Sequence, residues 1–391
     1  MLLATFGVGP RASGFAGWRA NSSGDHRRVP GTYARDCGVL VTTYARGVMT
    51  QKPFGRTQSG EEVVAYELAN ASGAAVRILN YGGIVQSLHV PDRAGLSCDV
   101  VLGGADLAFY LRRHPYFGCL VGRVAGRISG GKLYVGGQGY ALAVNNPPNH
   151  LHGGSVGLDR RVWRADPDGD SALLLRYRSP AGEEGYPGNV DFSVTYRLTE
   201  RNELVMTSES VADEPTPVSL TNHSYFNLAG EGSGPVDNHL LQILADEYVP
   251  TDKSLTLSGE RRPVAGEACD LRKPARLADF VPHLHLRHGD NYLLAPRGGE
   301  VAVVARLMEP RSGRTLEVRT DEACLQLYTG AYLDGSFVGK SGTRYAAHHG
   351  ICLECQGYPD GVAHPEFGDL IVRPGQPRLR TIVYAFGVVP D

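Results

Sequence analysis

A single acidic residue lies inside an otherwise apolar run near the end of the chain. The segment Ile351–Gln356 alternates with the period of two that is typical of a β-strand, so Glu354 shares a face with Cys352 and Gln356. Burial on such a face raises the pKa of a carboxyl group, because it disfavours the charged form. An enclosed Glu354 is therefore a candidate general base near neutral pH, whereas a solvent-facing Glu354 is an ordinary edge-strand residue.

Two histidines separated by one residue lie in the segment 149–154. In an extended segment this spacing places the imidazoles of His150 and His152 on one side of the chain, as a metal site requires. A metal also needs a third ligand, and with His223 the pair forms a candidate site for a metallo-hydrolase. The alternative is that both histidines belong to a turn and bind backbone groups or water.

His223 lies in a segment, 221–228, where aromatic and amide residues alternate. Alternation places it on the same face as Tyr225 and Asn227. An aromatic ring can stack on a sugar, an amide can hydrogen-bond its hydroxyls, and an imidazole can transfer a proton near pH 7. A histidine satisfied inside the core explains this pattern equally well.

Two arginines lie among glycines in the segment 122–128, at Arg123 and Arg127. The segment is not a phosphate loop, because it lacks the Gly-Lys-Ser/Thr ending of that motif. The guanidinium groups can instead offer donors to a hydroxylated or anionic ligand. Asp290 and Gln326 are further hydrogen-bonding residues beside aromatic ones, and each is also compatible with a turn or a buried strand.

The elements that must position these residues are mainly strands. The 391 residues include 50 glycines and 24 prolines, a composition typical of short strands joined by tight turns. The periodicity predicts a short helix at 107–112. It predicts strands at 63–68, 75–80, 84–90, 100–103, 172–177, 191–198, 203–210, 240–245, 301–308, 315–320, 323–328 and 380–387. No linker or internal repeat interrupts the chain after about residue 50, so we expect one all-β domain of stacked antiparallel sheets over 49–391.

Charge and cysteine content exclude several classes of protein. The net charge of −2 gives no basic surface for nucleic acid, and no stretch is long and apolar enough to span a membrane. Cys352 and Cys355 have CxxC spacing, but residues three apart on a strand point to opposite faces. We therefore expect buried, reduced thiols rather than a disulfide or a zinc site, and a cytoplasmic protein.

The first 48 residues differ from the rest of the chain. They are rich in arginine, glycine and serine and show little periodicity, and they lack the apolar core of a secretory signal. We expect 1–48 to be a disordered or over-long N-terminal extension, with Met49 opening the functional chain. A transit-like leader is the alternative.

Five segments occur in the order seen in the aldose 1-epimerases (galactose mutarotases), and from about Met49 onward the chain resembles that family. These segments are Gly122–Ile128, Asn149–Gly154, Asn222–Leu228, Leu325–Gly330 and Cys352–Gln356. The resemblance implies a large antiparallel β-sandwich, the galactose mutarotase-like supersandwich, with the sugar in an open cleft. It also implies that no metal or organic cofactor is used. We expect a monomer or a homodimer.

The resemblance implies a role for six residues. Glu354 would be the general base and His223 the general acid. The remaining four would bind the sugar: Arg127, His152, Asp290 and Gln326. Arg127 and His152 would also support the charge that develops on it. The reaction would be the interconversion of the α and β anomers of free hexoses such as D-glucose and D-galactose.

The chain departs from the family pattern at two positions. The family usually has an Asp, one further residue, and then an Asn and an aromatic residue, so without a gap its Asp falls on Gly289 rather than on Asp290. Many relatives also have an Asn where this chain has Gly126. Two other functions stay open from the sequence: a hexose-6-phosphate 1-epimerase that uses Arg123 and Arg127, and a sugar-binding protein without catalysis.

Overall fold

The computed structural model describes residues 12–15, 18, 49–295 and 298–390. The predicted N-terminal extension, 1–48, therefore lies almost entirely outside the described residues and stays a prediction. None of the described helices combines the length and apolar character needed to cross a membrane.

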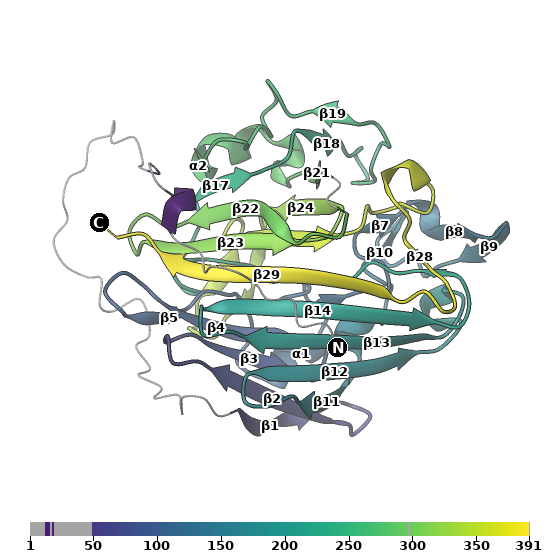
Figure 1. The fold of residues 1–391 in the computed structure, drawn as a ribbon, viewed down its shortest axis with the longest axis horizontal. Helices are drawn as coiled ribbons and strands as arrows, with labels where there is room; N and C mark the ends of the chain where they lie inside the picture. Colours follow the sequence, from purple (N-terminus) through teal and green to yellow (C-terminus); the bar gives the residue numbers. More distant parts are fainter. Residues whose placement is uncertain (1–11, 16–17, 19–48, 296–297, 391) are drawn as a thin grey trace.

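A nine-stranded antiparallel sheet forms the largest layer, and Figure 1 shows its long strands side by side across the molecule. In spatial order its strands are β11 (Arg164–Pro167), β12 (Ala172–Ser179), β13 (Val190–Leu198), β14 (Glu203–Ala212), β29 (Arg378–Val388), β23 (Arg314–Thr320), β22 (Ala302–Met308), β17 (Leu240–Ile243) and β20 (Ala275–Arg276).

Two five-stranded sheets accompany it. The first contains β1 (Thr50–Arg56), β2 (Glu62–Ala69), β3 (Ala75–Leu79), β4 (Val85–Pro91) and β5 (Ser97–Asp99). The second, which we call the site sheet, contains β19 (Arg262–Pro263), β18 (Glu247–Val249), β21 (Asn291–Leu293), β24 (Cys324–Tyr328) and β27 (Cys352–Gln356).

Short pairs of strands and single helical turns complete the fold. The pairs are β6 (Leu120–Val121) with β16 (Thr221–Asn222), β7 (Arg127–Ile128) with β10 (His150–Leu151), β8 (Lys132–Val135) with β9 (Gln138–Ala141), β15 (Thr216–Pro217) with β28 (Ile371–Val372), and β25 (Asp334–Val338) with β26 (Arg344–Ala346). The helices are α1 (Leu107–Leu111) and α2 (Leu277–Phe280), and the 3₁₀ turns are Ala12–Phe15, Ser129–Gly131, Leu158–Arg160, Glu183–Gly185, Val281–His283, His285–Arg287 and Pro365–Phe367.

The main core fills the space between the layers. Leu68 and Val76 from the first five-stranded sheet belong to the same buried cluster as Val194, Met206 and Ile382 from the nine-stranded sheet. Along β13 and β14 buried residues alternate with more exposed ones, as expected when one face of a sheet packs and the other meets water.

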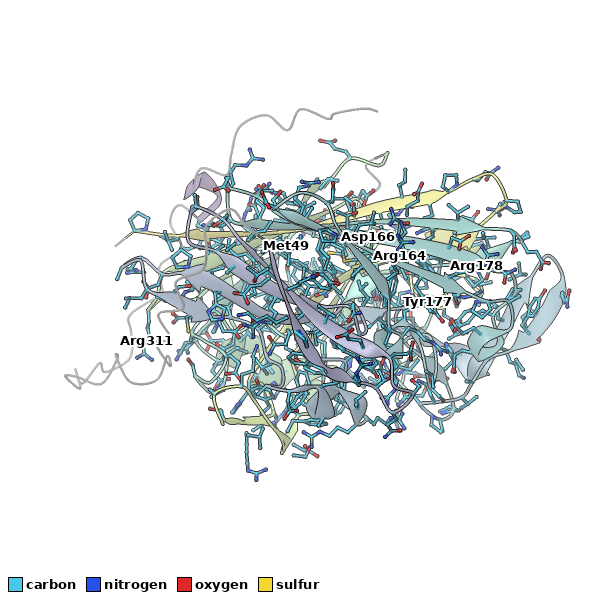
Figure 2. The ribbon with its side chains drawn as sticks, turned by 90° about the horizontal axis from the view of Figure 1, so that it is seen from below. Met49, Arg164, Asp166, Tyr177, Arg178 and Arg311 are labelled. Carbon is cyan, nitrogen blue, oxygen red and sulfur yellow. The ribbon has the colours of Figure 1, made fainter. Side chains whose placement is uncertain are left out.

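The outer face of the nine-stranded sheet carries charged side chains. Figure 2 shows Arg164 and Asp166 of β11 together with Arg178 of β12. Arg164 pairs with Asp166 at 3.2 Å, and the side chains of Arg178 and its partner Asp191 are 60% and 56% exposed. Exposed pairs of this kind contribute little to stability, so burial of the inner face is what holds the sheet in place.

The predicted all-β class and antiparallel sandwich are confirmed. The predicted helix is α1, capped by the Asp106 carboxylate, which accepts from the Phe109 amide. One predicted strand, 100–103, is wrong: it forms only an isolated bridge between Val101 and Phe226. The periodicity misses a number of strands, among them 50–56, 132–135, 138–141, 164–167, 247–249, 291–293 and 334–338, because most are short or lack clear alternation.

Candidate active site

The site sheet has one face on the core and one face on a cavity. Leu325, Leu327 and Leu353 belong to the main core, whereas Gln326 and Glu354 point the other way. These two residues are direct register partners on β24 and β27. The alternation predicted around Glu354 is therefore confirmed, and the face that carries Glu354 is enclosed rather than open to solvent: the residue is 2% exposed.

A cavity of about 200 Å³ lies in front of this face. Most side chains around it are aromatic rings, histidines and amides, which suit a ligand with both apolar faces and hydroxyl groups. Its walls include Tyr116, Arg127, Asn146, His152, His223, Tyr225, His288, Gln326, Tyr328, Tyr332, Glu354 and Gln356. Segments far apart in the chain thus meet at one place.

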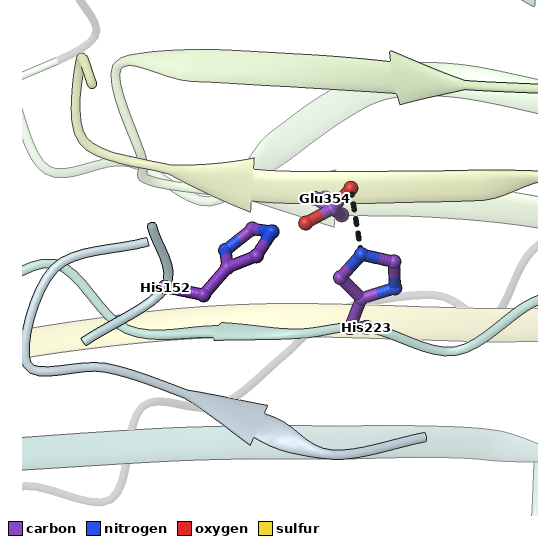
Figure 3. Close-up of side chains that lie close together, drawn as sticks. All are labelled: His152, His223 and Glu354. Atoms are coloured by element: carbon purple, nitrogen blue, oxygen red, sulfur yellow. Dashed lines mark ion pairs between the residues drawn. The ribbon is translucent and has the colours of Figure 1, made fainter. Parts of the chain in front are cut away.

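Three titratable side chains meet in this cavity. Nitrogen and oxygen atoms of His152, His223 and Glu354 lie within 4.8 Å of one another, and all three residues are buried. Figure 3 shows His223 below Glu354, with Nε2 of the histidine 3.6 Å from Oε1 of the carboxyl group. The other carboxyl oxygen, Oε2, is buried and has no hydrogen-bond partner among the described residues.

Burial shifts the pKa values of this pair in opposite directions. It raises the pKa of Glu354 to about 8, against the opposing effect of the nearby Arg127. It lowers the pKa of His223 to about 4. Between these two values the pair shares one proton, which rests on Glu354 while His223 is neutral. Glu354 becomes the base and His223 the acid when this proton moves to the imidazole.

Cys352 contacts the far side of the His223 ring. Its Sγ atom lies 3.5 Å from Nδ1. Burial raises the pKa of the thiol well above its ordinary value, so the sulfur keeps its proton. For Nε2 to share the proton of Glu354, the proton of the neutral ring lies on Nδ1, which then donates to the sulfur of Cys352.

His152 reaches the cavity through a turn rather than through an extended strand. β10 ends at Leu151, and His152 has a left-handed backbone with φ of 53°. The amide N–H of Gly126 donates to its Nδ1 at 3.1 Å. Because burial keeps the ring neutral by lowering its pKa, the single ring proton lies on Nε2, which is then a donor toward the cavity.

The expectation that His150 and His152 share one side is wrong. His150 Nδ1 lies 2.7 Å from the Ala143 carbonyl and its Nε2 lies 2.7 Å from the Tyr186 hydroxyl, so both nitrogens are used away from the cavity. The predicted alternative of a metal held by His150, His152 and His223 is therefore not assembled. A metal on His152, His223 and Glu354 is also disfavoured, because the Nε2 proton of His152 occupies the position that a metal would take.

The two arginines of 122–128 have separate roles. Arg127 lines the cavity, and its Nε donates to Oδ1 of Asn146 at 3.0 Å, which fixes the guanidinium plane. Arg123 turns into the interior, is 2% exposed, and donates to four backbone carbonyls and the hydroxyl of Ser179. Arg127 is therefore the candidate ligand-binding residue, and Arg123 stabilises the loops around it.

This assignment predicts a large loss of stability on replacement of Arg123. Arg123→Met leaves buried carbonyls without donors, and we expect the free energy of unfolding to fall by about 3 kcal/mol or more. Urea unfolding of the variant measures this loss, with Arg178→Met as the exposed control, for which we expect a change within about 1 kcal/mol. A variant of normal stability with a raised KM would instead place Arg123 in the binding site.

Gln326 lies in the cavity wall, where the resemblance implies a sugar-binding residue, whereas Asp290 lies outside that wall. Gln326 lines the cavity; its amide nitrogen donates to the Leu327 carbonyl at 2.6 Å, so Oε1 is left as an acceptor. Asp290 is not part of the cavity wall. It precedes Asn291, whose register partner is Gln326, and alternation turns its carboxyl group to the other face, where burial first and the charge of Asp290 second raise the pKa of Tyr292.

The cavity wall also contains residues that the sequence analysis did not select. These are Tyr116, Asn146, His288 and Tyr332, all from loops or turns. His288 opens a polar segment that does stand out in the sequence, yet Asp290 attracts attention there because of its charge. No sequence signal singles out Tyr116 or Asn146, because no periodic pattern surrounds them.

The family model for aldose 1-epimerase matches residues 64–385. The galactose mutarotases of Mus musculus and Homo sapiens are each 42% identical to this chain over 340 residues, covering 87% of it and 99% of their own length. The aldose 1-epimerase of Escherichia coli (strain K12) is 34% identical over 327 residues, covering 82% of this chain and 94% of its own length. A solved structure of the GalM/aldose epimerase homologue from C. elegans has a TM-score of 0.78 at 30% identity, covering 83% of this chain and 98% of its own. This chain therefore belongs to the aldose 1-epimerase family.

Proposed function

We propose that this aldose 1-epimerase interconverts the α and β anomers of free hexoses, D-galactose and D-glucose among them, by acid–base opening and closure of the sugar ring. The observation that carries the proposal is the buried pair of Glu354 and His223, 3.6 Å apart in one cavity, with pKa values shifted in opposite directions. The names of the curated relatives, galactose mutarotase and aldose 1-epimerase, support the class of substrate.

The reaction needs one base and one acid on the two oxygens attached to C1. Glu354 removes the proton of the C1 hydroxyl while His223 delivers a proton to the ring oxygen, and the C1–ring-oxygen bond breaks. The open aldehyde rotates about C1–C2, and the ring closes on the other face of the carbonyl with the two roles exchanged. Each group contributes about 10²–10⁴-fold to the rate. No group is transferred and no electrons change hands, so the reaction requires neither a metal nor an organic cofactor.

Hydrogen-bond donors near Glu354 and His223 can stabilise the negative charge that develops on the sugar oxygens. The Nε2–H of His152 points into the cavity, and Arg127 is held by Asn146 with the rest of its guanidinium group available. Fixed donors of this kind stabilise a developing oxyanion more than mobile water does. Gln326 Oε1 offers an acceptor to a sugar hydroxyl.

The alternative substrate, a hexose 6-phosphate, is not favoured by the cavity. Among the described residues of its wall, Arg127 is the single arginine or lysine, and its Nε is already bound to Asn146. Arg123, the second basic residue considered for a phosphate, is used by backbone carbonyls. A sugar-binding protein without catalysis has no need for the buried pair. A cytoplasmic location and a monomeric or homodimeric state stay predictions.

The direct test follows the optical rotation or the NMR spectrum of freshly dissolved α-D-galactose and α-D-glucose with the purified protein. We expect anomer exchange well above the spontaneous rate, with glucose 6-phosphate as the comparison substrate. Acceleration with the phosphorylated sugar alone would replace the proposed substrate. No acceleration with any of the three sugars would contradict the proposed function.

The shifted pKa values predict a bell-shaped pH profile. Below about pH 4 Glu354 is a neutral acid and His223 an imidazolium, so no base is left; above about pH 8 Glu354 is ionised and His223 is neutral, so no acid is left. We therefore expect kcat/KM to be highest between these limits and to fall on both sides. Initial rates at a series of pH values, corrected for the buffer-catalysed reaction, measure this profile. A rate that keeps rising beyond pH 9 would contradict the assigned pair.

A further inference from the structure

One side of the cavity lacks the carboxylate that the family pattern places there. The pattern puts the acidic residue at Gly289, and the backbone at this position does not accept a side chain. Its φ is +114°, and a Cβ atom would lie 2.3 Å from the carbonyl oxygen of Leu327. Asp290 faces the other side of the strand. The described residue of this segment that does line the cavity is His288.

We propose that His288 is a substrate-binding residue that helps to determine which sugars the enzyme accepts, and that its Nε2 atom accepts a hydrogen bond from a hydroxyl group of the sugar ring. The proposal rests on the proposed function of the same cavity and adds a contact specific to this chain.

The hydrogen bonding of the ring fixes which nitrogen is the acceptor. Nδ1 of His288 lies 3.2 Å from the carbonyl oxygen of Gly289, and a carbonyl oxygen only accepts, so Nδ1 carries the proton. Burial lowers the pKa of His288 to about 4, which keeps the ring neutral at neutral pH. Nε2 is therefore a bare acceptor, and no described residue donates to it.

The ring is held in place by aromatic neighbours. Its centroid lies 4.8 Å from that of Tyr328 and 5.6 Å from that of Tyr332. Tyr328 is buried in the cavity wall, whereas Tyr332 is 56% exposed at the rim. A ring packed against two others loses little freedom when a ligand binds, so an acceptor at Nε2 is already positioned for the sugar.

An acceptor at this position complements the rest of the site. His152 and Arg127 present N–H groups to the cavity, so they can donate hydrogen bonds to the lone pairs of sugar oxygens. A hydroxyl group also has a proton to donate, and His288 Nε2, Gln326 Oε1 and the unpartnered Oε1 of Gln356 are neutral acceptors in the wall that can take it. A neutral acceptor is weaker than a carboxylate, so we expect about a tenfold effect from this hydrogen bond, not a larger one.

Two substitutions separate the hydrogen bond from the packing. His288→Phe keeps an aromatic ring against Tyr328 and removes Nε2, whereas His288→Gln replaces the ring but can place an amide oxygen near the position of Nε2. His285→Phe is the matched control, because His285 is exposed three residues earlier and does not line the cavity. Circular dichroism establishes that each variant is folded, and His288→Met takes the place of His288→Phe if that variant is not.

The experiment measures kcat and KM for D-galactose and for its 2-, 3-, 4- and 6-deoxy analogues. We expect His288→Phe to lower kcat/KM for galactose about tenfold, mainly through KM, with His288→Gln recovering part of the loss. For one deoxy sugar the wild-type enzyme is expected to be about tenfold weaker, and His288→Phe is expected to cause no further loss. An equal loss on all five sugars, or no loss on any, would overturn the proposal.

Failure of the proposed function is distinguishable from failure of this contact. If the wild-type protein does not accelerate the mutarotation of any sugar, the proposed function is wrong. Dissociation constants for the same five sugars, measured by ligand-observed NMR titration, then test His288 alone. A pattern in which one analogue is insensitive to His288→Phe supports the contact, and a uniform pattern rejects it.

Discussion

Replacement of Glu354 by glutamine is expected to lower kcat about 10³-fold or more while the affinity for the sugar changes only a few-fold. Glutamine has nearly the shape of glutamic acid and keeps one oxygen for hydrogen bonding, but it cannot take a proton from the C1 hydroxyl. The loss of a general base costs about 10²–10⁴-fold in rate. Glu354 is the single Asp or Glu among the described residues that line the cavity, so no neighbouring carboxylate can substitute for it as the base.

Polarimetry gives the rate of the Glu354→Gln variant, and an NMR titration gives its affinity for galactose. Glu209→Gln, an exposed residue on β14, is the control for the substitution itself and is expected to leave the rate unchanged. A Glu354→Gln enzyme with turnover close to the wild type would remove Glu354 from the mechanism. If the affinity for galactose fell by as large a factor as the rate, Glu354 would be a substrate-binding residue and not the base.

Replacement of His223 by glutamine is expected to lower kcat about 10²–10³-fold and to change the shape of the pH profile. Glutamine can still donate a hydrogen bond toward Glu354, but it cannot deliver a proton to the ring oxygen. In this variant Glu354 acts alone, and it acts as a base only when ionised. Since burial raises its pKa to about 8, the residual rate should rise as the pH passes this value.

The direction of that change is the informative readout. The wild-type rate is expected to fall above about pH 8, where the pair loses its last proton, whereas the variant rate is expected to rise there. Rates at pH 6, 7, 8 and 9 for both proteins are sufficient to compare the two limbs. A His223→Gln profile that keeps the wild-type shape at a lower level would show that His223 positions the sugar and is not the acid.

Periodicity in the sequence was sufficient to predict the class of fold. Alternation along Ile351–Gln356 placed Glu354 on one face and Leu353 on the other, and the structure has Glu354 on the cavity and Leu353 in the core. The same reasoning placed His223 with Tyr225, and both line the cavity. Such predictions hold because the alternation of side chains in an extended chain is a local property.

Alternation failed where the chain leaves the extended conformation. His150 and His152 were expected on one side, but the left-handed φ at His152 rotates the second ring into the cavity and leaves the first in the interior. Next to β21 the same kind of break, at Gly289, places His288 on the cavity and turns Asp290 away. A residue in the left-handed region reverses the order of faces, and residue types alone do not reveal where that happens.

Residue types and motifs indicate which side chains are able to do acid–base chemistry and, through the family resemblance, which reaction they suit. Which of these side chains meet in one cavity depends on the folded chain. In the sequence Arg123 and Arg127 are equally plausible ligand-binding residues. In the structure Arg123 donates to backbone carbonyls and Arg127 lines the cavity. Residue type and periodicity are local properties, whereas the site is assembled from β7, the turn after β10, the segment after β16, β24 and β27. Their meeting depends on strand register and on turn geometry, which are settled by the packing of the whole domain.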